Sequence, residues 1–399
     1  MPGGLRPLVI GDLKVELPIV QGGMGVMVST AALASAVADC GAAGTISGVA
    51  LGYGTPENEI DYPAASRKAL REEIRKAKEA TDGVVGVNLL GAMTNYDELA
   101  RTAAEAGADF IASGAGLPLS LPQHTEGSDT RLIPIVSSGR AAAVIARSWK
   151  KRYGRVPDAF IVEGPLAGGH LGFHKDEVQA PAPGVLEGLV REVLTVARDC
   201  ANSPVPVIAA GGVFDGKDAA RFLALGASGV QIATRLVATY ECSVAQAFKD
   251  LYVSARPEDV VIIDSPVGMP GRAIRTPFVD RLLRGEREPF ECGYQCLKTC
   301  NPRTAPYCIA KALFNAVRGD LDHAVVFAGF NVSRVREIVS TRELLERFAA
   351  QAEAELAHLG GVSRRPLGSG FPTAPSATGN CAGRVPGARA AARRRESPG

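Results

Sequence analysis

The chain has 399 residues, of which 46% are hydrophobic and 22% are charged, the composition of an ordinary globular protein. Its net charge is +2, but residues 362–399 alone hold seven arginines and one glutamate, so the rest of the chain is acidic and nucleic acid is not an expected partner. The sequence shows neither a run of about 18 apolar residues nor a secretory leader, so we expect a cytoplasmic protein without membrane contact, whose thiols stay reduced.

The chain carries eight short apolar segments that do not alternate with polar residues. Such strands, when helical stretches separate them, indicate a parallel sheet that is covered on both faces. Eight of them in a chain of this length predict a (β/α)8 TIM barrel, and a doubly wound open sheet is the alternative. The expected strands are residues 18–21, 44–47, 84–89, 109–113, 132–137, 158–162, 205–210 and 229–233.

Several of these strands follow a helix that ends in glycine. Gly41, Gly107 and Gly226 each close a helical pattern two or three residues before an apolar strand. Glycine adopts the left-handed backbone conformation that ends many helices, so the repeated pattern indicates a series of αβ loops. An insert at residues 50–81 interrupts the pattern, and we expect a helix at residues 63–80 within it.

The regular rhythm of helix and strand ends near residue 255. We therefore assign residues 1–255 to the barrel and residues 256–360 to a smaller helical domain that packs over it. Residues 361–399 are rich in Pro, Gly, Ser, Ala and Arg and contain few large apolar side chains, a composition that predicts a disordered basic tail. In this second half of the chain, helices are expected at residues 240–255, 309–318 and 340–359.

Ligand-binding residues of a barrel lie where the strands end, on one face. The segment IVEGPLAGGHLGF, residues 161–173, follows the sixth expected strand and contains Glu163, Gly168, Gly169 and His170. Glycine lets the backbone approach a ligand closely, and an imidazole, with an ordinary pKa near ~6.5, exchanges protons close to neutral pH. A glycine-rich turn with an incidental histidine is the alternative.

Small residues also follow other strands. Gly211 and Gly212 follow the seventh strand, and Ala233 and Thr234 follow the eighth, where backbone N–H groups and short helix N-termini bind phosphate in many barrels. A lone phosphate would need no residues on distant strands, whereas a flat and wide phosphorylated ligand would. The candidates on those distant strands are Gly22, Gly23 and Met24 after the first strand and Asn88 in the third.

Six motifs together resemble one enzyme family. They are QGGMG at residues 21–25, VNLL at 87–90, EGPLAGGHLG at 163–172, AAGGVFDG at 209–216, GVQIATR at 229–235 and SPVGMPGRAI at 265–274. Over residues 18–345 the sequence resembles the nitronate monooxygenases, formerly called 2-nitropropane dioxygenases, which are FMN-dependent (β/α)8 barrels.

The resemblance implies an FMN site built from the residues above. Asn88 would lie at the polar edge of the flavin and Met24 beside its ring. Gly168 and Gly169 would pass close to the isoalloxazine, and His170 would be the catalytic residue. The FMN phosphate would lie at Gly211, Gly212, Ala233 and Thr234. Relatives usually carry glycine at position 233, and glutamine or glutamate at position 163.

The resemblance also implies a reaction. An FMN-dependent nitronate monooxygenase oxidises an alkyl nitronate with O2 to a carbonyl compound and nitrite, so the expected partners are a small-molecule substrate and O2, for a monomer or homodimer. NAD(P)H-dependent enoyl-thioester (enoyl-ACP) reductases and quinone reductases share the QGGM-like and GGH motifs and are the alternative. A flavin-binding protein without turnover is a third interpretation, against which the presence of His170 argues.

A cluster of four cysteines follows the barrel. Cys292, Cys296, Cys300 and Cys308 are spaced C-x3-C-x3-C-x7-C, which matches neither a zinc knuckle nor a ferredoxin motif. On a helix the first three would share one face. We expect these cysteines to be small packing residues and predict no metal site, while a metal ion and a redox disulfide are the alternatives.

Overall fold

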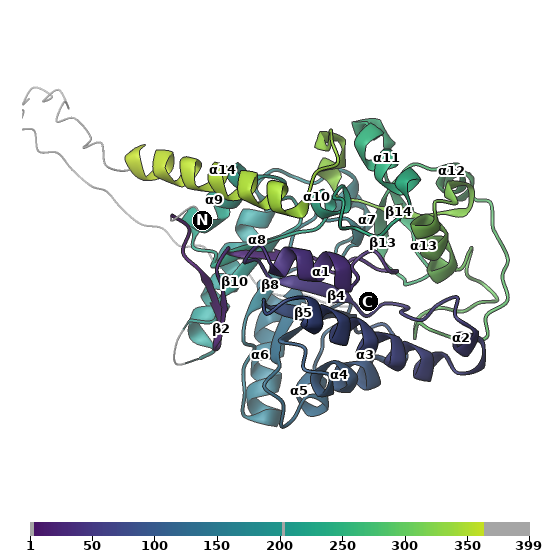
Figure 1. The fold of residues 1–399 in the computed structure, drawn as a ribbon, viewed down its shortest axis with the longest axis horizontal. Helices are drawn as coiled ribbons and strands as arrows, with labels where there is room; N and C mark the ends of the chain where they lie inside the picture. The colour runs from purple at the N-terminus through teal and green to yellow at the C-terminus, as the bar shows by residue number, and fades with distance from the viewer. Residues whose placement is uncertain (1–3, 202–203, 363–399) are drawn as a thin grey trace, which may run out of the picture.

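The computed structural model describes residues 4–201 and 204–362, and eight parallel strands form its central sheet (Figure 1). Their order is β3-β11-β10-β8-β7-β6-β5-β4. The first and last members of this order meet, because Gln21 N–H donates to the Ala43 carbonyl and Ala43 N–H to the Ile19 carbonyl, at 2.8 and 2.9 Å. The expected (β/α)8 barrel is therefore confirmed. The strands are β3 (Ile19–Gln21), β4 (Gly44–Ser47), β5 (Val85–Leu90), β6 (Phe110–Gly114), β7 (Arg131–Val136), β8 (Phe160–Glu163), β10 (Val207–Ala210) and β11 (Gly229–Ile232).

A hairpin closes the amino-terminal end of the barrel. Its strands β1 (Leu8–Ile10) and β2 (Leu13–Val15) pair antiparallel. Leu8, Ile10 and Val15 are fully buried in one cluster with the side chains that fill the barrel interior, such as those of Phe110 and Ile208. Apolar side chains therefore close the barrel interior at this end.

Helices cover the outside of the sheet. The expected insert helix is α3 (Tyr62–Ala80), where the Asp61 side chain accepts a hydrogen bond from Ala64 N–H as the N-cap. Gly41, Gly107 and Gly226 have φ of +82°, +78° and +110°, so the predicted αβ loops are present. The other long helices of the barrel are α1 (Ala31–Ala38), α4 (Tyr96–Glu105), α6 (Gly139–Tyr153), α8 (Val185–Asp199) and α9 (Gly216–Leu225), and short helices are α2 (Pro56–Ile60), α5 (Leu121–His124), α7 (Lys175–Gln179) and α10 (Thr234–Val237).

The region after the barrel is not purely helical, which corrects the expectation. Strands β12 (Val260–Asp264) and β13 (Pro270–Ile274) form a hairpin, and β13 also pairs antiparallel with β14 (Val326–Phe327) and with β9 (Gly169–His170). Four consecutive β-branched residues open this hairpin, and such side chains favour extended backbone. The cap thereby joins the glycine-rich segment of the barrel edge to edge.

In the described residues, three further α-helices follow α11 (Gln246–Ser254), which begins six residues later than expected. They are α12 (Pro277–Leu283), α13 (Ile309–Arg318) and α14 (Thr341–Val362), the last two at their predicted places. Helix α14 lies along α9 of the barrel (Figure 1), and a Cβ at Gly216 would come within 2.1 Å of the Phe348 carbonyl oxygen. The domain boundaries remain a prediction, and the expected tail falls almost entirely outside the described residues. Within the described ranges, no helix has the length and hydropathy needed to cross a membrane.

Candidate active site

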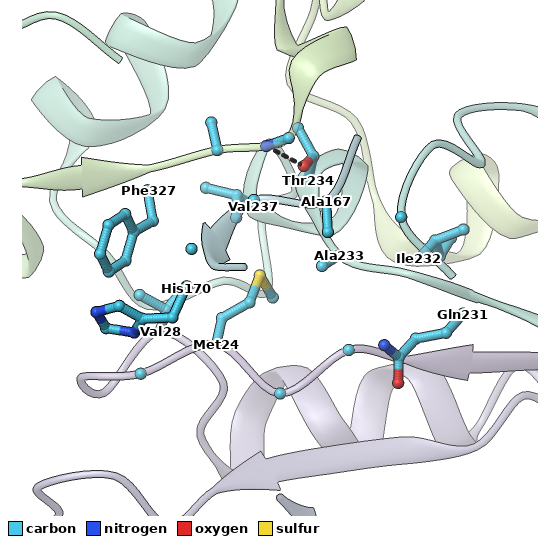
Figure 2. Close-up of a pocket in the computed structure, with 18 of the residues that line it drawn as sticks. Met24, Val28, Ala167, His170, Gln231, Ile232, Ala233, Thr234, Val237 and Phe327 are labelled. Carbon is cyan, nitrogen blue, oxygen red and sulfur yellow. Dashed lines mark hydrogen bonds between the residues drawn. The ribbon is translucent and has the colours of Figure 1, made fainter. Parts of the chain in front are cut away.

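All twelve residues singled out from the sequence line one cavity at the carboxyl ends of the strands, which we call the central cavity. Parallel strands end at the same edge of a sheet, so segments far apart in the chain meet there. Figure 2 shows Met24 rising into this cavity between His170 on one side and Ala233 on the other. The twelve are Gly22, Gly23, Met24, Asn88, Glu163, Gly168, Gly169, His170, Gly211, Gly212, Ala233 and Thr234.

Close backbone packing explains several of the glycines. A Cβ at Gly23 would lie 2.2 Å from the Asn88 Cβ, and one at Gly168 would lie 2.4 Å from the Ala328 carbonyl carbon. Gly211 and Gly212 have φ of +78° and +129°, a backbone conformation that side chains disfavour. These positions therefore require glycine to shape the cavity, whatever ligand the cavity holds.

One end of the central cavity is suited to a phosphate group. Among the described residues, the N–H groups of Gly212 and Ala233 donate to no protein acceptor. Thr234 Oγ1 accepts a hydrogen bond from Gly329 N–H at 3.0 Å, so its own proton is left to donate. Asn331 Nδ2 donates to the Gly212 carbonyl at 3.1 Å and holds the loop in place. These donors could bind the oxygen atoms of a phosphate monoester.

A positive charge lies at the same end, on Arg235, a residue that follows the eighth strand and to which sequence reasoning gave no role. Its guanidinium lies 4.6 Å from the centre of the Phe214 ring, and Arg334 lies 4.1 Å from that ring. Arg334 forms ion pairs with Asp215 and Asp218, whereas Arg235 has no ion pair among the described residues. Burial lowers the pKa of Arg235. Its position directly after Thr234 was the signal available in the sequence.

Polar groups at the other end of the cavity are fewer. Asn88 is 5% exposed, and its Nδ2 donates to the Ala112 carbonyl at 3.3 Å. Its Oδ1 makes no hydrogen bond within the described part of the chain, so it is left to meet a ligand. The loop that carries Met24 is fixed by Ser29, whose Oγ accepts hydrogen bonds from Gln21 Nε2 and Met24 N–H at 3.0 and 3.1 Å.

His170 is held on one side only. Its Nε2 lies 2.7 Å from Ser265 Oγ, and its ring meets the Phe327 ring edge-on at 4.9 Å. Nδ1 has no hydrogen-bond partner among the described residues and is not occluded, so this nitrogen can meet a ligand. Burial lowers the pKa of His170 to about 4, so the imidazole is neutral at pH 7.

Glu163 faces the same space at the end of β8. Burial raises the pKa of its carboxyl group to about 7, so protonated and ionised forms coexist near neutral pH. Glu163 and His170 line both the central cavity and a second one of about 640 Å³, which we call the side cavity. The two titratable groups therefore stand where the two cavities meet.

Two residues of the SPVGMPGRAI motif support His170 and its loop, and sequence reasoning gave neither a role. One is Ser265, described above. The other is Arg272, which is 1% exposed and donates to the carbonyl groups of Pro165, Ala167 and Val178 at 2.5–2.7 Å. Burial lowers the pKa of Arg272 to about 10, so it stays charged at pH 7. Its guanidinium fixes the backbone just before Gly168.

The four cysteines lie in an irregular segment, residues 292–308, and not on one helix face. Cys296, Cys300 and Cys308 pack partly buried against the main core, and burial raises the pKa of the Cys296 thiol to about 12, with the neighbouring cysteines adding to the effect. In the ranges that the structure describes, no three His, Cys, Asp or Glu side chains are arranged to hold a metal ion. The packing role remains a prediction.

Comparison with known proteins gives the family. The model of the nitronate monooxygenase family matches residues 6–104 and 90–351. A (3aS,4S,5R,7aS)-5-hydroxy-7a-methyl-1-oxo-octahydro-1H-indene-4-carboxyl-CoA dehydrogenase of Mycobacterium tuberculosis is 30% identical over 283 residues, 71% of this chain and 70% of that protein. A probable nitronate monooxygenase of Staphylococcus aureus is 32% identical over 130 residues, 32% of this chain and 35% of that protein.

Solved structures agree with this match. FabK from Thermotoga maritima is similar with a TM-score of 0.69 and 29% identity over 87% of this chain and 96% of that one. A nitroalkane oxidase from Streptomyces ansochromogenes shares the fold, with a TM-score of 0.66 and 20% identity over 86% of this chain and 98% of that one. Because the family model spans most of the described residues, the chain belongs to the nitronate monooxygenase family of oxidoreductases.

Proposed function

We propose that the central cavity binds FMN and that the enzyme acts on an uncharged substrate activated by a carbonyl group. The substrate class that we propose is an acyl thioester. The observation that carries this proposal is the distribution of charge. Among the described residues that line the two cavities, only Arg235 is a cation, and it lies at the phosphate end. At the junction of the cavities, the neutral His170 and the half-ionised Glu163 offer nothing that attracts an anion.

The residues of the central cavity fit FMN. Its phosphate would be held by the N–H groups of Gly212 and Ala233, the Thr234 hydroxyl and Arg235, and its polar ring edge by Asn88. When bound, FMN supplies the redox chemistry, which is transfer of a hydride or of single electrons. The protein's contribution is to position the substrate and to hold or move a proton.

Glu163 would perform that proton work, and His170 would position the substrate. His170 Nδ1 is the ring nitrogen that no protein group uses, so it would contact the substrate carbonyl or the atom beside it. The Glu163 carboxyl, with its pKa raised to about 7, can release or accept a proton near neutral pH. A general acid or base works best when its pKa lies close to the operating pH. A relative supports a thioester, since the Mycobacterium tuberculosis protein is named a carboxyl-CoA dehydrogenase.

Nitronate oxidation by O2 is the second candidate, which the family's name and the Staphylococcus aureus relative favour. A nitronate is an anion and would gain most from a protonated imidazole. With the pKa of His170 lowered to about 4, roughly one molecule in a thousand carries that proton at pH 7. This electrostatic mismatch places nitronate oxidation behind the thioester reaction.

The test compares three substrate classes on the FMN-loaded protein. Anaerobic NADPH is added, and the bleaching of the flavin is followed before a trans-enoyl thioester or a quinone is supplied. Oxidation of propyl 2-nitronate with O2 is measured in parallel. We expect the thioester to reoxidise the flavin with the highest kcat/KM. Faster turnover of the nitronate would refute the proposed substrate, and a protein that takes up no FMN would refute the cofactor.

A further inference from the structure

The side cavity lies next to the central cavity and shares four lining residues with it. They are Ala115, Ile135, Glu163 and His170. Its volume of about 640 Å³ falls in the range of ~300–1,000 Å³ that small-molecule pockets occupy. A substrate whose reacting group contacts His170 can therefore extend from the junction into this space.

The walls of the side cavity are largely hydrocarbon. Helices α6 and α8, the segment after β9 and the hairpin of the cap all contribute to them. Leu117, from the loop after β6, also belongs to the lining and is 49% exposed, so it lies where this cavity meets solvent. Besides Ala115 and Ile135, the apolar lining residues are Leu117, Val136, Ala141, Pro165, Phe173, Ala180, Ala182, Val185, Leu189 and Met269.

The polar groups of the side cavity are mostly engaged already. Ser138 Oγ accepts the N-cap hydrogen bond from Ala141 N–H at 3.2 Å, and Glu177 Oε2 accepts one from His174 N–H at 2.7 Å. In the described part of the chain, no lysine or arginine lines this cavity. The charges that are present, on Glu177 and on the ionised form of Glu163, repel anions. A phosphate or a terminal carboxylate would find no partner here, whereas an alkyl chain would lose water-exposed surface and gain contacts.

We propose that the side cavity binds the aliphatic acyl chain of the substrate, with its thioester carbonyl at His170. The inference rests on the proposed function for the identity of the reacting group, and on the cavity alone for the chain. It predicts a substrate with a long uncharged hydrocarbon part, and it predicts that chain length sets affinity. Burial of each methylene is worth ~0.8 kcal/mol, which corresponds to about a fourfold change in the dissociation constant.

The experiment measures binding without turnover. Saturated N-acetylcysteamine thioesters, which are uncharged and cannot react as enoyl acceptors, are titrated into the FMN-loaded protein by calorimetry in a series from butanoyl to decanoyl. The wild-type dissociation constant should fall about fourfold per methylene until the cavity is full. Leu189→Trp should abolish this dependence by filling the cavity. The matched control, Thr195→Trp, lies exposed on the same helix α8 and should keep it.

A second variant tests the inference even if Leu189→Trp fails to fold. Leu117→Lys changes an exposed loop residue and places a cation at the entrance, so it should weaken decanoyl binding several-fold while leaving butanoyl binding unchanged. Dissociation constants that do not depend on chain length, or an undiminished dependence in both Leu189→Trp and Leu117→Lys, would overturn the inference. Binding that depends on chain length, without any reduction of enoyl thioesters, would refute the proposed reaction but would still support the side cavity as the site of the acyl chain.

Discussion

Replacing Ser265 by alanine should disable His170 without touching the cavity walls. Ser265 is 9% exposed, and its Oγ lies 2.7 Å from His170 Nε2 and accepts a hydrogen bond from Val267 N–H at 3.3 Å. Each such hydrogen bond contributes ~0.5–1.5 kcal/mol net, so losing both should lower the free energy of unfolding by about 1–3 kcal/mol. Urea unfolding, with an unchanged slope, measures this loss.

The same change should affect turnover more than binding. Without its partner the imidazole can rotate, and a misplacement of about 1 Å costs on the order of 100-fold in rate. We expect kcat to fall about 10- to 100-fold in Ser265→Ala, with KM and FMN content nearly unchanged. Ser265→Thr keeps the hydroxyl group and should recover most of the rate, which a role in packing alone would not predict.

Ser333 provides the matched control. It is also 9% exposed, and its hydroxyl makes no hydrogen bond within the described part of the chain. Ser333→Ala should therefore change neither stability nor kcat by more than a small factor. The reasoning fails if Ser265→Ala turns over at the wild-type rate, or if Ser333→Ala loses as much activity as Ser265→Ala.

Four other outcomes follow from the structure. Glu163→Gln should be more stable than wild type, and the difference in the free energy of unfolding should grow as pH rises from about 4.5 to 7 and then stay constant at up to about 3 kcal/mol. The reason is that the buried wild-type carboxyl keeps a proton that the unfolded chain releases. Urea titrations at several pH values measure this difference. Arg235→Gln should weaken FMN binding about 10- to 100-fold by fluorescence titration, whereas Arg334→Gln, which removes the other guanidinium beside the Phe214 ring, should not. Gly23→Ala should lower the free energy of unfolding by about 1–3 kcal/mol and reduce FMN occupancy, because its new Cβ would lie 2.2 Å from a neighbouring side-chain carbon. Gly188→Ala, in open space on a helix, should be tolerated. Elemental analysis should find neither zinc nor iron, and a stoichiometric amount of either would contradict the packing role of the four cysteines.

Local pattern in the sequence was sufficient for the barrel and for residues that line the central cavity. The β4 strand, Gly44–Ser47, occurs exactly where a continuous apolar run predicted it, and helix α13 has its predicted bounds. Once the strands were placed, the parallel topology required their carboxyl ends to converge. The sequence therefore predicted that residues as distant as Gly22 and Thr234 line one cavity, as they do.

The cap shows where local pattern fails. Residues 260–274 form a hairpin whose second strand, β13, pairs with β9, which contains His170. The periodicity of neither the hairpin nor β9 predicts that pairing. Edge pairing depends on which backbone groups are left without partners after the barrel has closed, which is a property of the assembled fold. The helical cap that we expected was wrong in this part for that reason.

The sequence by itself determined the strand and helix pattern, the glycines that let the backbone turn and approach, and the presence of one histidine at the mouth of the barrel. Only the tertiary structure decided how that histidine is held, because Ser265 lies 95 residues away in the chain and reaches it through the cap. The side cavity and the altered pKa values of His170 and Glu163 also arise only in the folded chain, since burial and void space are produced by packing between segments that are remote in sequence.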